Sequence, residues 1–232
     1  MPTFPICLKE LRSILQSDSR LIIDLPEGFQ RAAVLIPFIL REKGWALVFT
    51  RRTENVPHHK KEISFPGGRY EEEQDKDLIH TALREVREEL GINKIVTFGI
   101  LDDLLTISNY VVTPVLGFIE NNRELDNAVI DTSEIDYILE IMISDLTVPK
   151  QFSVKKMTYR DRYSFQVPFF DYHGEIIWGA TGRILVNLLK KINLLPPDCR
   201  FTLMKQDLWH EDVNIDNGLD YLNNLKILKD KK

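Results

Sequence analysis

The chain has 232 residues, of which 44% are hydrophobic and 28% are charged, and its formal net charge is −5. This balance is typical of a folded globular protein and excludes a chain that is disordered throughout. The acidic charge argues against electrostatic coating of nucleic acid, and no apolar run reaches the length of a membrane span. We therefore expect neither a nucleic-acid partner nor a membrane partner.

Length and cysteine content set the expected domain count and location. A chain of this length suits one domain with elaborations. The N-terminal segment lacks the long apolar stretch of a secretory signal. The two cysteines, Cys7 and Cys199, are too few for a disulfide framework, so a reducing, cytoplasmic location is expected.

Hydrophobic periodicity predicts alternating strands and helices, in a fold of the α+β class or an α/β/α sandwich. Two hairpins are expected where Lys43-Gly44 and His173-Gly174 separate apolar runs. Strands are predicted, in chain order, over 31–40, 45–52, 63–65, 95–101, 111–119, 163–172 and 175–177. Helices are predicted over 8–15, 75–90, 134–144, 182–192 and 219–228.

The segment 75–90 gives the strongest helix signal. Asp75 is the expected N-cap, and Gly91 follows where a left-handed C-terminal residue belongs. Apolar side chains at helical spacing predict a stripe that faces the core: Ile79, Ala82, Leu83, Val86 and Leu90.

Three carboxylates, Glu85, Glu88 and Glu89, fall within an arc of roughly 100° beside this stripe. One interpretation is a solvated acidic face interleaved with Arg84 and Arg87. The other is a divalent-cation site, because clustered carboxylate oxygens suit Mg²⁺ or Mn²⁺ and the ion relieves their repulsion. The two glycines that precede the helix, just after a short strand, favour the second interpretation because backbone there can approach a ligand closely.

The block FPGGRYEEEQDKDLIHTALREVREELGI resembles the Nudix box, GX₅EX₇REUXEEXGU with U aliphatic. Its second half matches without a break from Arg84 to Ile92. The resemblance implies a Nudix-type α/β/α sandwich with a mixed sheet. It also implies an enzyme that hydrolyses the phosphoanhydride bond of a nucleoside diphosphate linked to another group.

The first half of the box departs from the pattern. Gly68 and Arg84 are sixteen residue steps apart, whereas the box has fourteen, which indicates an insertion in the loop 69–75. Either Glu73 or Asp75 can then supply the carboxylate that the box places there, and the sequence does not choose between them.

The segment before the box, VFTRRTENVPHHKKEISFPGG, resembles the coenzyme A diphosphatase motif LLTXRSX₃RX₃GX₃FPGG. Thr50, Arg52 and the run 65–68 are in register, whereas Pro57 replaces an arginine and Lys61 replaces a glycine. Similar runs downstream extend the resemblance over residues 30 to 192: HTALRE at 80–85, VTPV at 112–115 and IWGATG at 177–182. The implied organisation is an N-terminal helical extension, a Nudix hydrolase domain and a C-terminal extension of uncertain structure, over 1–29, 30–195 and 196–232.

The resemblance also implies roles for the box residues. Glu85 and Glu89, one helical turn apart, are the implied main ligands of Mg²⁺ or Mn²⁺. Glu88 is the implied third ligand, and the Gly67 carbonyl a further one. Arg84 is expected to orient the glutamates by ion pairing and completes the catalytic set of Glu85, Glu88 and Arg84. The general base stays open between one of these carboxylates and a residue from a later loop.

Substrate-binding residues are expected on the loop before the box and on its glycines: Arg52, His59, Lys61, Gly67 and Gly68. His58 and Lys60 belong to the same polar loop, for which an exposed segment without a function is the alternative.

The implied reaction converts coenzyme A or acyl-CoA to 3′,5′-ADP and (acyl-)4′-phosphopantetheine. The departures at Pro57 and Lys61 leave open another Nudix substrate, such as NADH, ADP-ribose or a dinucleoside polyphosphate. A non-catalytic Nudix binding module is a further alternative, although the three box glutamates are present. The expected partner is a small nucleotide, and a homodimer is compatible with the sequence.

Overall fold

The computed structural model describes residues 8–15, 20–56, 59–159 and 163–195. Its helices are Leu8–Leu15 (α1), Leu78–Leu90 (α2), Asn122–Asp126 (α3), Ile143–Leu146 (α4) and Gly179–Lys191 (α5), with a 3-10 turn at Pro149–Gln151 (η1). Its strands are Gln30–Arg41 (β1), Gly44–Arg52 (β2), Ile63–Ser64 (β3), Gly67–Arg69 (β4), Ile95–Ile100 (β5), Leu104–Leu105 (β6), Tyr110–Ile119 (β7), Ile135–Met142 (β8), Phe152–Tyr159 (β9), Tyr163–Tyr172 (β10) and Glu175–Ile177 (β11).

The main sheet is mixed, as predicted. Its strands follow the order β3-β2-β1-β7-β5, with β4 paired to β1, β6 to β7 and β8 to β2. β1 and β7 run parallel, whereas the other described pairs of this sheet are antiparallel. The first predicted hairpin is confirmed, because Arg41 pairs with Gly44 across the turn between β1 and β2.

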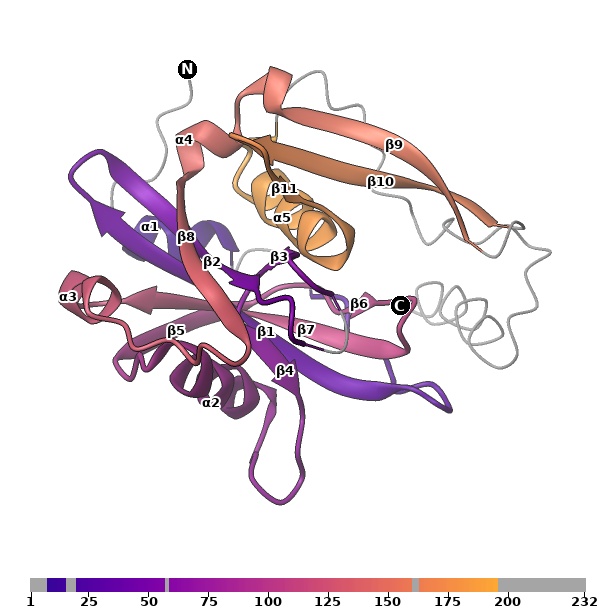
Figure 1. Cartoon of the computed structure of the whole chain (residues 1–232), viewed down its shortest axis with the longest axis horizontal. Coiled ribbons are helices and arrows are strands. Elements are labelled where there is room, and N and C mark those ends of the chain that lie inside the picture. The colour runs from indigo at the N-terminus through magenta and orange to yellow at the C-terminus, as the bar shows by residue number, and fades with distance from the viewer. Residues whose placement is uncertain (1–7, 16–19, 57–58, 160–162, 196–232) are drawn as a thin grey trace.

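A second, three-stranded sheet has the order β11-β10-β9. It contains the second predicted hairpin, in which Tyr172 pairs with Glu175 across His173-Gly174. Trp178 follows β11 and stacks on Phe169 with ring planes 9° apart, at the point where α5 begins. Figure 1 shows this small sheet and α5 together on one side of the main sheet.

The layers follow from alternation along β1. Ala33, Leu35 and Ile39 pack against the apolar stripe of α2. Ile36 and Phe38 point to the opposite face, where they join side chains of α1 and α5. A strand buried on both faces reads as a continuous apolar run, which is why RAAVLIPFIL carries little polar-apolar alternation. The α/β/α sandwich is therefore confirmed, with α2 on one face and α1 and α5 on the other (Figure 1).

The predicted helix over 134–144 is wrong. Residues 135–142 form β8, which pairs with β2, and only the short α4 follows. The sequence IDYILEIM carries three isoleucines and a tyrosine, and β-branched and aromatic side chains favour a pleated surface. The edge of β2 supplies the hydrogen-bonding partner that decides the outcome.

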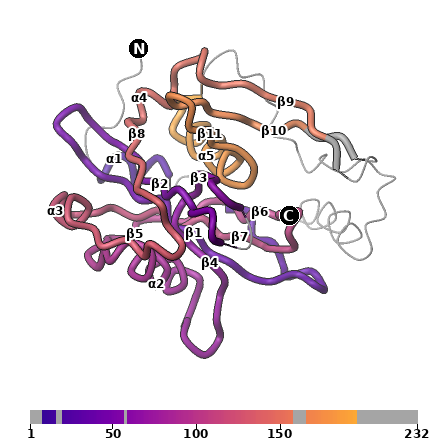
Figure 2. The backbone as a smooth tube through the Cα atoms, in the orientation of Figure 1, coloured from indigo at the N-terminus to yellow at the C-terminus, as the bar shows by residue number. Residues whose placement is uncertain are grey.

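The start of the predicted box helix is also corrected. Asp77, not Asp75, is the N-cap of α2, and its side chain accepts a hydrogen bond from the His80 amide. The predicted C-terminus is confirmed, because Gly91 has a φ of 68° and its amide donates to the Arg87 carbonyl. The loop that joins β4 to α2 is the long one at the bottom of Figure 2.

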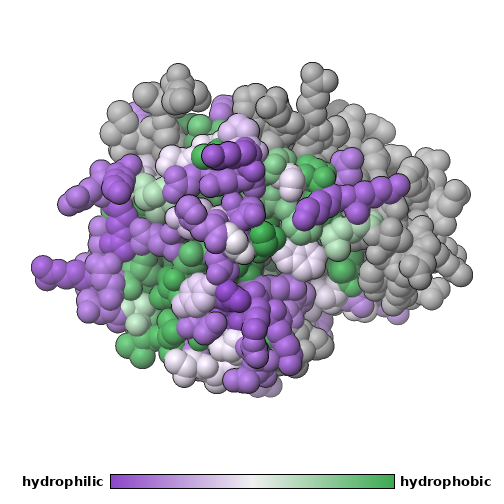
Figure 3. All heavy atoms as spheres, turned by 45° about the horizontal axis from the view of Figure 1, so that its top comes forward, coloured by the Kyte–Doolittle hydropathy of each residue, from purple (hydrophilic) through white to green (hydrophobic). Residues whose placement is uncertain are grey.

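In the described ranges, no helix has the length and apolar character needed to cross a membrane. On the face shown in Figure 3, hydrophilic side chains of the described residues lie beside patches of apolar ones. The predicted last helix over 219–228 and the two cysteines lie outside the described residues.

Candidate functional site

The three box glutamates do not share one environment. The Glu89 side chain is 6% exposed and that of Glu85 is 16% exposed, whereas that of Glu88 is 54% exposed. Glu88 accepts a hydrogen bond from Arg84 at 2.8 Å. The predicted acidic arc therefore divides into the buried Glu89, the half-buried Glu85 and the exposed Glu88, and a uniformly solvated acidic face does not describe it.

Backbone of β4 lies directly against Glu85. β4 is held at the end of β1, where Gly68 is paired with Ala33 and Gly67 with Val34. A methyl group at Gly68 would overlap the Glu85 carboxylate. The close backbone approach expected of the two glycines is therefore present, and it brings β4 against a box glutamate.

Replacement of Gly68 by alanine should displace the Glu85 carboxylate and lower turnover by roughly tenfold or more, because a misplaced catalytic group loses its orientation. The thermal midpoint should change little, since the displaced atoms are the end of a flexible side chain. Gly67→Ala is the contrasting variant, because its methyl would meet Ala33 and Val34 backbone and should destabilise the fold itself. Wild-type turnover in Gly68→Ala would contradict the placement of Glu85 in the reaction.

Glu89 is the most strongly perturbed acid of the site. Burial raises its pKa to about 8, the neighbouring Glu85 and Glu134 carboxylates act in the same direction, and Arg52 and the Gly67 amide oppose them. Its Oε2 atom is buried and has no hydrogen-bond partner among the described residues. A buried acceptor without a donor is costly, and a cation is one group that would satisfy it.

Arg84 organises this end of α2. Its guanidinium contacts Glu85 at 2.9 Å and the Arg69 carbonyl at 3.0 Å, besides Glu88. It also makes two 3.0 Å hydrogen bonds to Asp75, whose side chain is fully buried. Glu73 is exposed in the same loop. The structure thus selects Asp75 as the loop carboxylate that pairs with Arg84.

Arg52 reaches the box from the end of β2. Its guanidinium lies 3.9 Å from Glu89 Oε1 and 3.4 Å from Glu134 Oε2. Glu134 stands just before β8, and its charge raises the pKa of both Glu85 and Glu89. Sequence reasoning missed Glu134 as a site residue because it assigned this segment to a helix. The β-branched and aromatic residues of IDYILEIM were the available signal for a strand, which begins directly after Glu134.

The loop residues predicted to bind substrate are less closely placed. His59 pairs with Glu62 at 2.9 Å and Lys61 pairs with Glu54, and both predicted side chains are more than half exposed. The Lys61 amide donates to the Arg52 carbonyl at 3.2 Å, which keeps the loop backbone next to the site. The structure brings neither side chain to the box carboxylates, and Pro57 and His58 lie outside the described residues.

The carboxylates of the box fit a divalent cation without forming a complete ligand cluster. In the part of the chain that is described, no three carboxylate, imidazole or thiolate groups form a ready-made metal cluster. Glu85 lies against Gly68 and Glu89 beside the Gly67 amide, and the buried Glu89 Oε2 atom has no hydrogen-bond partner among the described residues. Hard oxygen donors of this kind fit Mg²⁺ or Mn²⁺. The residues fit such an ion as a two-carboxylate core, and Glu88 would join only by leaving Arg84.

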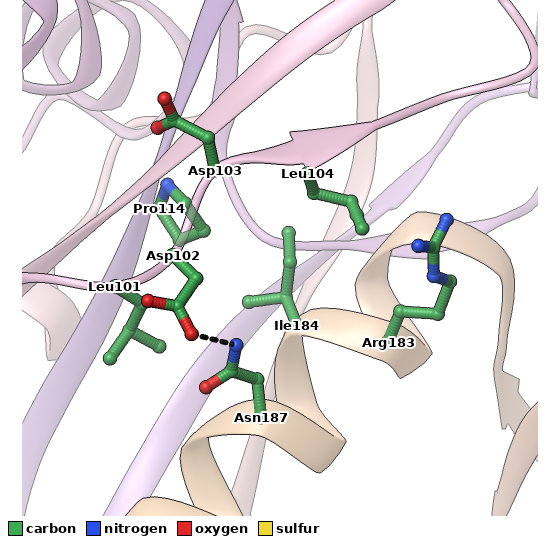
Figure 4. Close-up of a pocket in the computed structure, with 8 residues that line it drawn as sticks. All are labelled: Leu101, Asp102, Asp103, Leu104, Pro114, Arg183, Ile184 and Asn187. Atoms are coloured by element: carbon green, nitrogen blue, oxygen red, sulfur yellow. Dashed lines mark hydrogen bonds between the residues drawn. The ribbon is translucent and has the colours of Figure 1, made fainter. Parts of the chain in front are cut away.

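A small cavity lies elsewhere, between α5 and the segment 101–104 (Figure 4). Asp102 accepts a hydrogen bond there from Asn187 at 3.1 Å, and Arg183 donates to the Leu105 carbonyl at 3.1 Å. None of the residues that line it belongs to the predicted site.

Comparison with known proteins shows the family of the chain. The NUDIX domain profile matches residues 29–138. The uncharacterized Nudix hydrolase NudL of Photorhabdus laumondii is 30% identical over 172 residues, which cover 73% of this chain and 89% of that protein. NudL of Yersinia pestis is 32% identical over 71% of this chain and 81% of its own length. Nudix hydrolase 3 of Caenorhabditis elegans is 29% identical over 82% of this chain and 84% of its own length. The chain therefore belongs to the Nudix hydrolase family, whose members act on pyrophosphate bonds and generally use divalent cations.

Proposed function

We propose that this chain hydrolyses the pyrophosphate bond of coenzyme A or acyl-CoA to 3′,5′-ADP and (acyl-)4′-phosphopantetheine. The observation that carries the proposal is the approach of Arg52 to Glu89, at 3.9 Å. Arg52 belongs to the segment that resembles the coenzyme A diphosphatase motif, and Glu89 belongs to the Nudix box. A guanidinium beside these carboxylates is suited to hold a phosphate whose other oxygens face a metal ion.

The barrier to pyrophosphate hydrolysis is largely electrostatic. A bound Mg²⁺ or Mn²⁺ supplies charge neutralisation at the phosphate oxygens and makes a bound water more acidic. Glu85, Glu89 and the Gly67 carbonyl are proposed to hold that ion, with Glu88 as a further ligand. Arg84 orients Glu85 by their 2.9 Å contact.

The proton acceptor and the residues that contact the far end of the substrate are proposed from their positions alone. The proton acceptor is proposed to be one of the site carboxylates, and Glu134 joins that set because it faces the same arginine as Glu89. Gly68 leaves room for the Glu85 carboxylate against the backbone, and His59 and Lys61 are proposed to meet the far end of the substrate from their exposed loop.

A panel of substrates tests the proposal. The purified protein is incubated with Mg²⁺ or Mn²⁺ and coenzyme A, acetyl-CoA, NADH, ADP-ribose or a dinucleoside polyphosphate, and the products are identified by mass spectrometry. We expect 4′-phosphopantetheine from coenzyme A in the presence of metal, and none after chelation. Hydrolysis of another member of the panel without release of 4′-phosphopantetheine would reject the coenzyme A assignment and retain the family assignment.

A different nucleotide substrate remains the second proposal. Lys61 occupies a glycine position of the coenzyme A motif, and its side chain pairs with Glu54 on the exposed loop. This departure alters the surface beside Arg52, where the far end of the substrate is expected. NADH, ADP-ribose and dinucleoside polyphosphates are the alternatives that the panel separates.

The proposal also includes the bounds of the hydrolase domain and its location in the cell. Residues 30–195 are proposed as the hydrolase domain, flanked by extensions over 1–29 and 196–232, and the cytoplasm is its proposed location. α1 from the first extension contributes Leu11 and Leu15 to the core that also contains α5.

A further inference from the structure

Three side chains from two sheets meet behind the end of β2. Arg51 Nη1 donates to the Tyr137 hydroxyl at 2.7 Å and to Glu175 Oε1 at 2.9 Å. The Tyr137 hydroxyl also donates to Glu175 Oε1, which closes a triangle of hydrogen bonds. Arg51 lies on β2, Tyr137 on β8 and Glu175 on β11, so this triangle ties the small sheet to the main sheet.

The triangle is better shielded than an ordinary surface ion pair. The Arg51 and Glu175 side chains are only 24% and 27% exposed. The Arg51 guanidinium carbon lies 5.4 Å from the centre of the Tyr137 ring, so the ring covers one side of the cation. A charge pair with this shielding and several hydrogen bonds holds its partners more firmly than an exposed pair does.

A β-bulge lies at the same place. Arg51 is paired with Tyr137, but the next residue, Arg52, is paired with Ile135, which leaves Asp136 without a partner on β2. Such a bulge bends the strand and re-aims the side chains beside it. Beyond it, the Thr53 amide donates to the Glu134 carbonyl at 2.8 Å, in the segment that carries the second carboxylate facing Arg52.

We propose that the Arg51–Tyr137–Glu175 triangle fixes this bulge and thereby holds Arg52 beside Glu89 and Glu134. The three are positioning residues, because each acts through Arg52 and none contacts the box carboxylates. Glu175 lies outside residues 29–138, so the triangle depends on the small sheet as well as on the part of the chain that matches the NUDIX profile. The kinetic part of its test rests on the proposed function.

Tyr137→Phe tests the proposal, since it removes the hydroxyl shared by Arg51 and Glu175 and keeps the ring. We expect kcat/KM for the substrate found in the panel to fall roughly tenfold, mainly through KM, with a modest fall in the thermal midpoint. In an Arg52→Gln background the same change should cause little further loss, because the hydroxyl acts through Arg52. Tyr172→Phe is the matched control, because Tyr172 lies on β10 opposite Glu175. This variant should behave as wild type.

Two kinetic results would overturn the proposal. One is a Tyr137→Phe loss that is equally large with and without Arg52, which means that the hydroxyl acts independently of it. The other is an unchanged KM in Tyr137→Phe. Glu175→Gln adds a rescue test, because the amide oxygen can still accept the hydrogen bonds and should recover more of kcat/KM than Glu175→Ala does.

A readout without turnover separates this proposal from the proposed function. Amide hydrogen exchange of Arg52 and Thr53 reports the bulge directly, because these amides donate to the Glu62 and Glu134 carbonyls at 3.1 and 2.8 Å. We expect faster exchange there in Tyr137→Phe and not in Tyr172→Phe. Unchanged exchange would reject the positioning role even if coenzyme A is hydrolysed. Faster exchange in a protein that hydrolyses none of the panel would leave the role standing and reject the function.

Discussion

Glu89→Gln should lose at least roughly a hundredfold in metal-dependent turnover and, without metal, should be more stable than the wild-type protein at alkaline pH. Turnover falls because the amide carries no negative charge for the cation. Stability rises because burial, with the nearby Glu85 charge, raises the pKa of Glu89 to about 8 in the folded protein. Keeping that carboxylate ionised in the fold therefore costs free energy, and glutamine removes the cost.

The sign of the pH dependence follows from that raised pKa. Between the ordinary carboxyl pKa near 4.5 and about 8, the folded state holds the proton more tightly than the unfolded state does. The free energy of unfolding of the wild-type protein therefore falls as pH rises through this window, relative to Glu89→Gln. Below the window the two should converge, and at pH 8.5 the variant should be more stable by at least about 1 kcal/mol.

Denaturant unfolding of both proteins at pH 5 and pH 8.5, in the presence of a chelator, measures this difference. Glu42→Gln is the matched control, because Glu42 is exposed in the turn after β1 and should show no change. A Glu89→Gln protein that is less stable than wild type at pH 8.5 would contradict the raised pKa of the buried Glu89 carboxylate.

Asp75→Asn should destabilise the protein by about 2 kcal/mol or more, because it removes the fully buried carboxylate that accepts two hydrogen bonds from Arg84 and leaves that cation only Glu85 and Glu88. Burial alone would raise the pKa of Asp75. Hydrogen bonds from Arg84, His80, Thr81 and the Glu71 amide overcome that effect and hold the pKa well below its ordinary value. This stabilisation is present above the ordinary carboxyl pKa and is lost as pH falls through the lower pKa of the folded state.

The measurement is the thermal midpoint at pH 7 and again at pH 3, where the wild-type advantage should be smaller. Asp77→Asn is the matched control, because asparagine is also a good N-cap and the same chemical change two residues away should cost little. Equal stabilities of the two variants at pH 7 would show that the Asp75–Arg84 pair does not hold the loop onto α2.

The sequence predicted those parts of the fold that local chemistry decides. The turn at Lys43-Gly44 and the helix that ends at Gly91 are set by glycine conformation and by apolar periodicity over a few residues. The segment 134–144 failed because its carboxylates and leucine also suit a helix, and only the free edge of β2 makes it a strand. Such pairing joins residues about 90 positions apart, which periodicity does not register.

The candidate site also contains some residues that the sequence predicts and others that it does not. The box glutamates, Arg84 and the two glycines could be found by spacing, because they lie within one strand-loop-helix unit. The choice of Asp75 over Glu73 could not, since it depends on how the inserted loop folds back onto Arg84. The approach of Glu134 to Arg52 was equally hidden, because the two residues meet only when β8 pairs with β2.

Crystals soaked in Mn²⁺ test the central claim most directly, through an anomalous difference map of the wild-type protein and of Glu89→Gln. The account predicts a manganese peak at the Glu85 and Glu89 carboxylates in the wild-type protein and a weak or missing peak in the variant. Wild-type crystals with no peak there, and with these side chains turned away from one another, would contradict it.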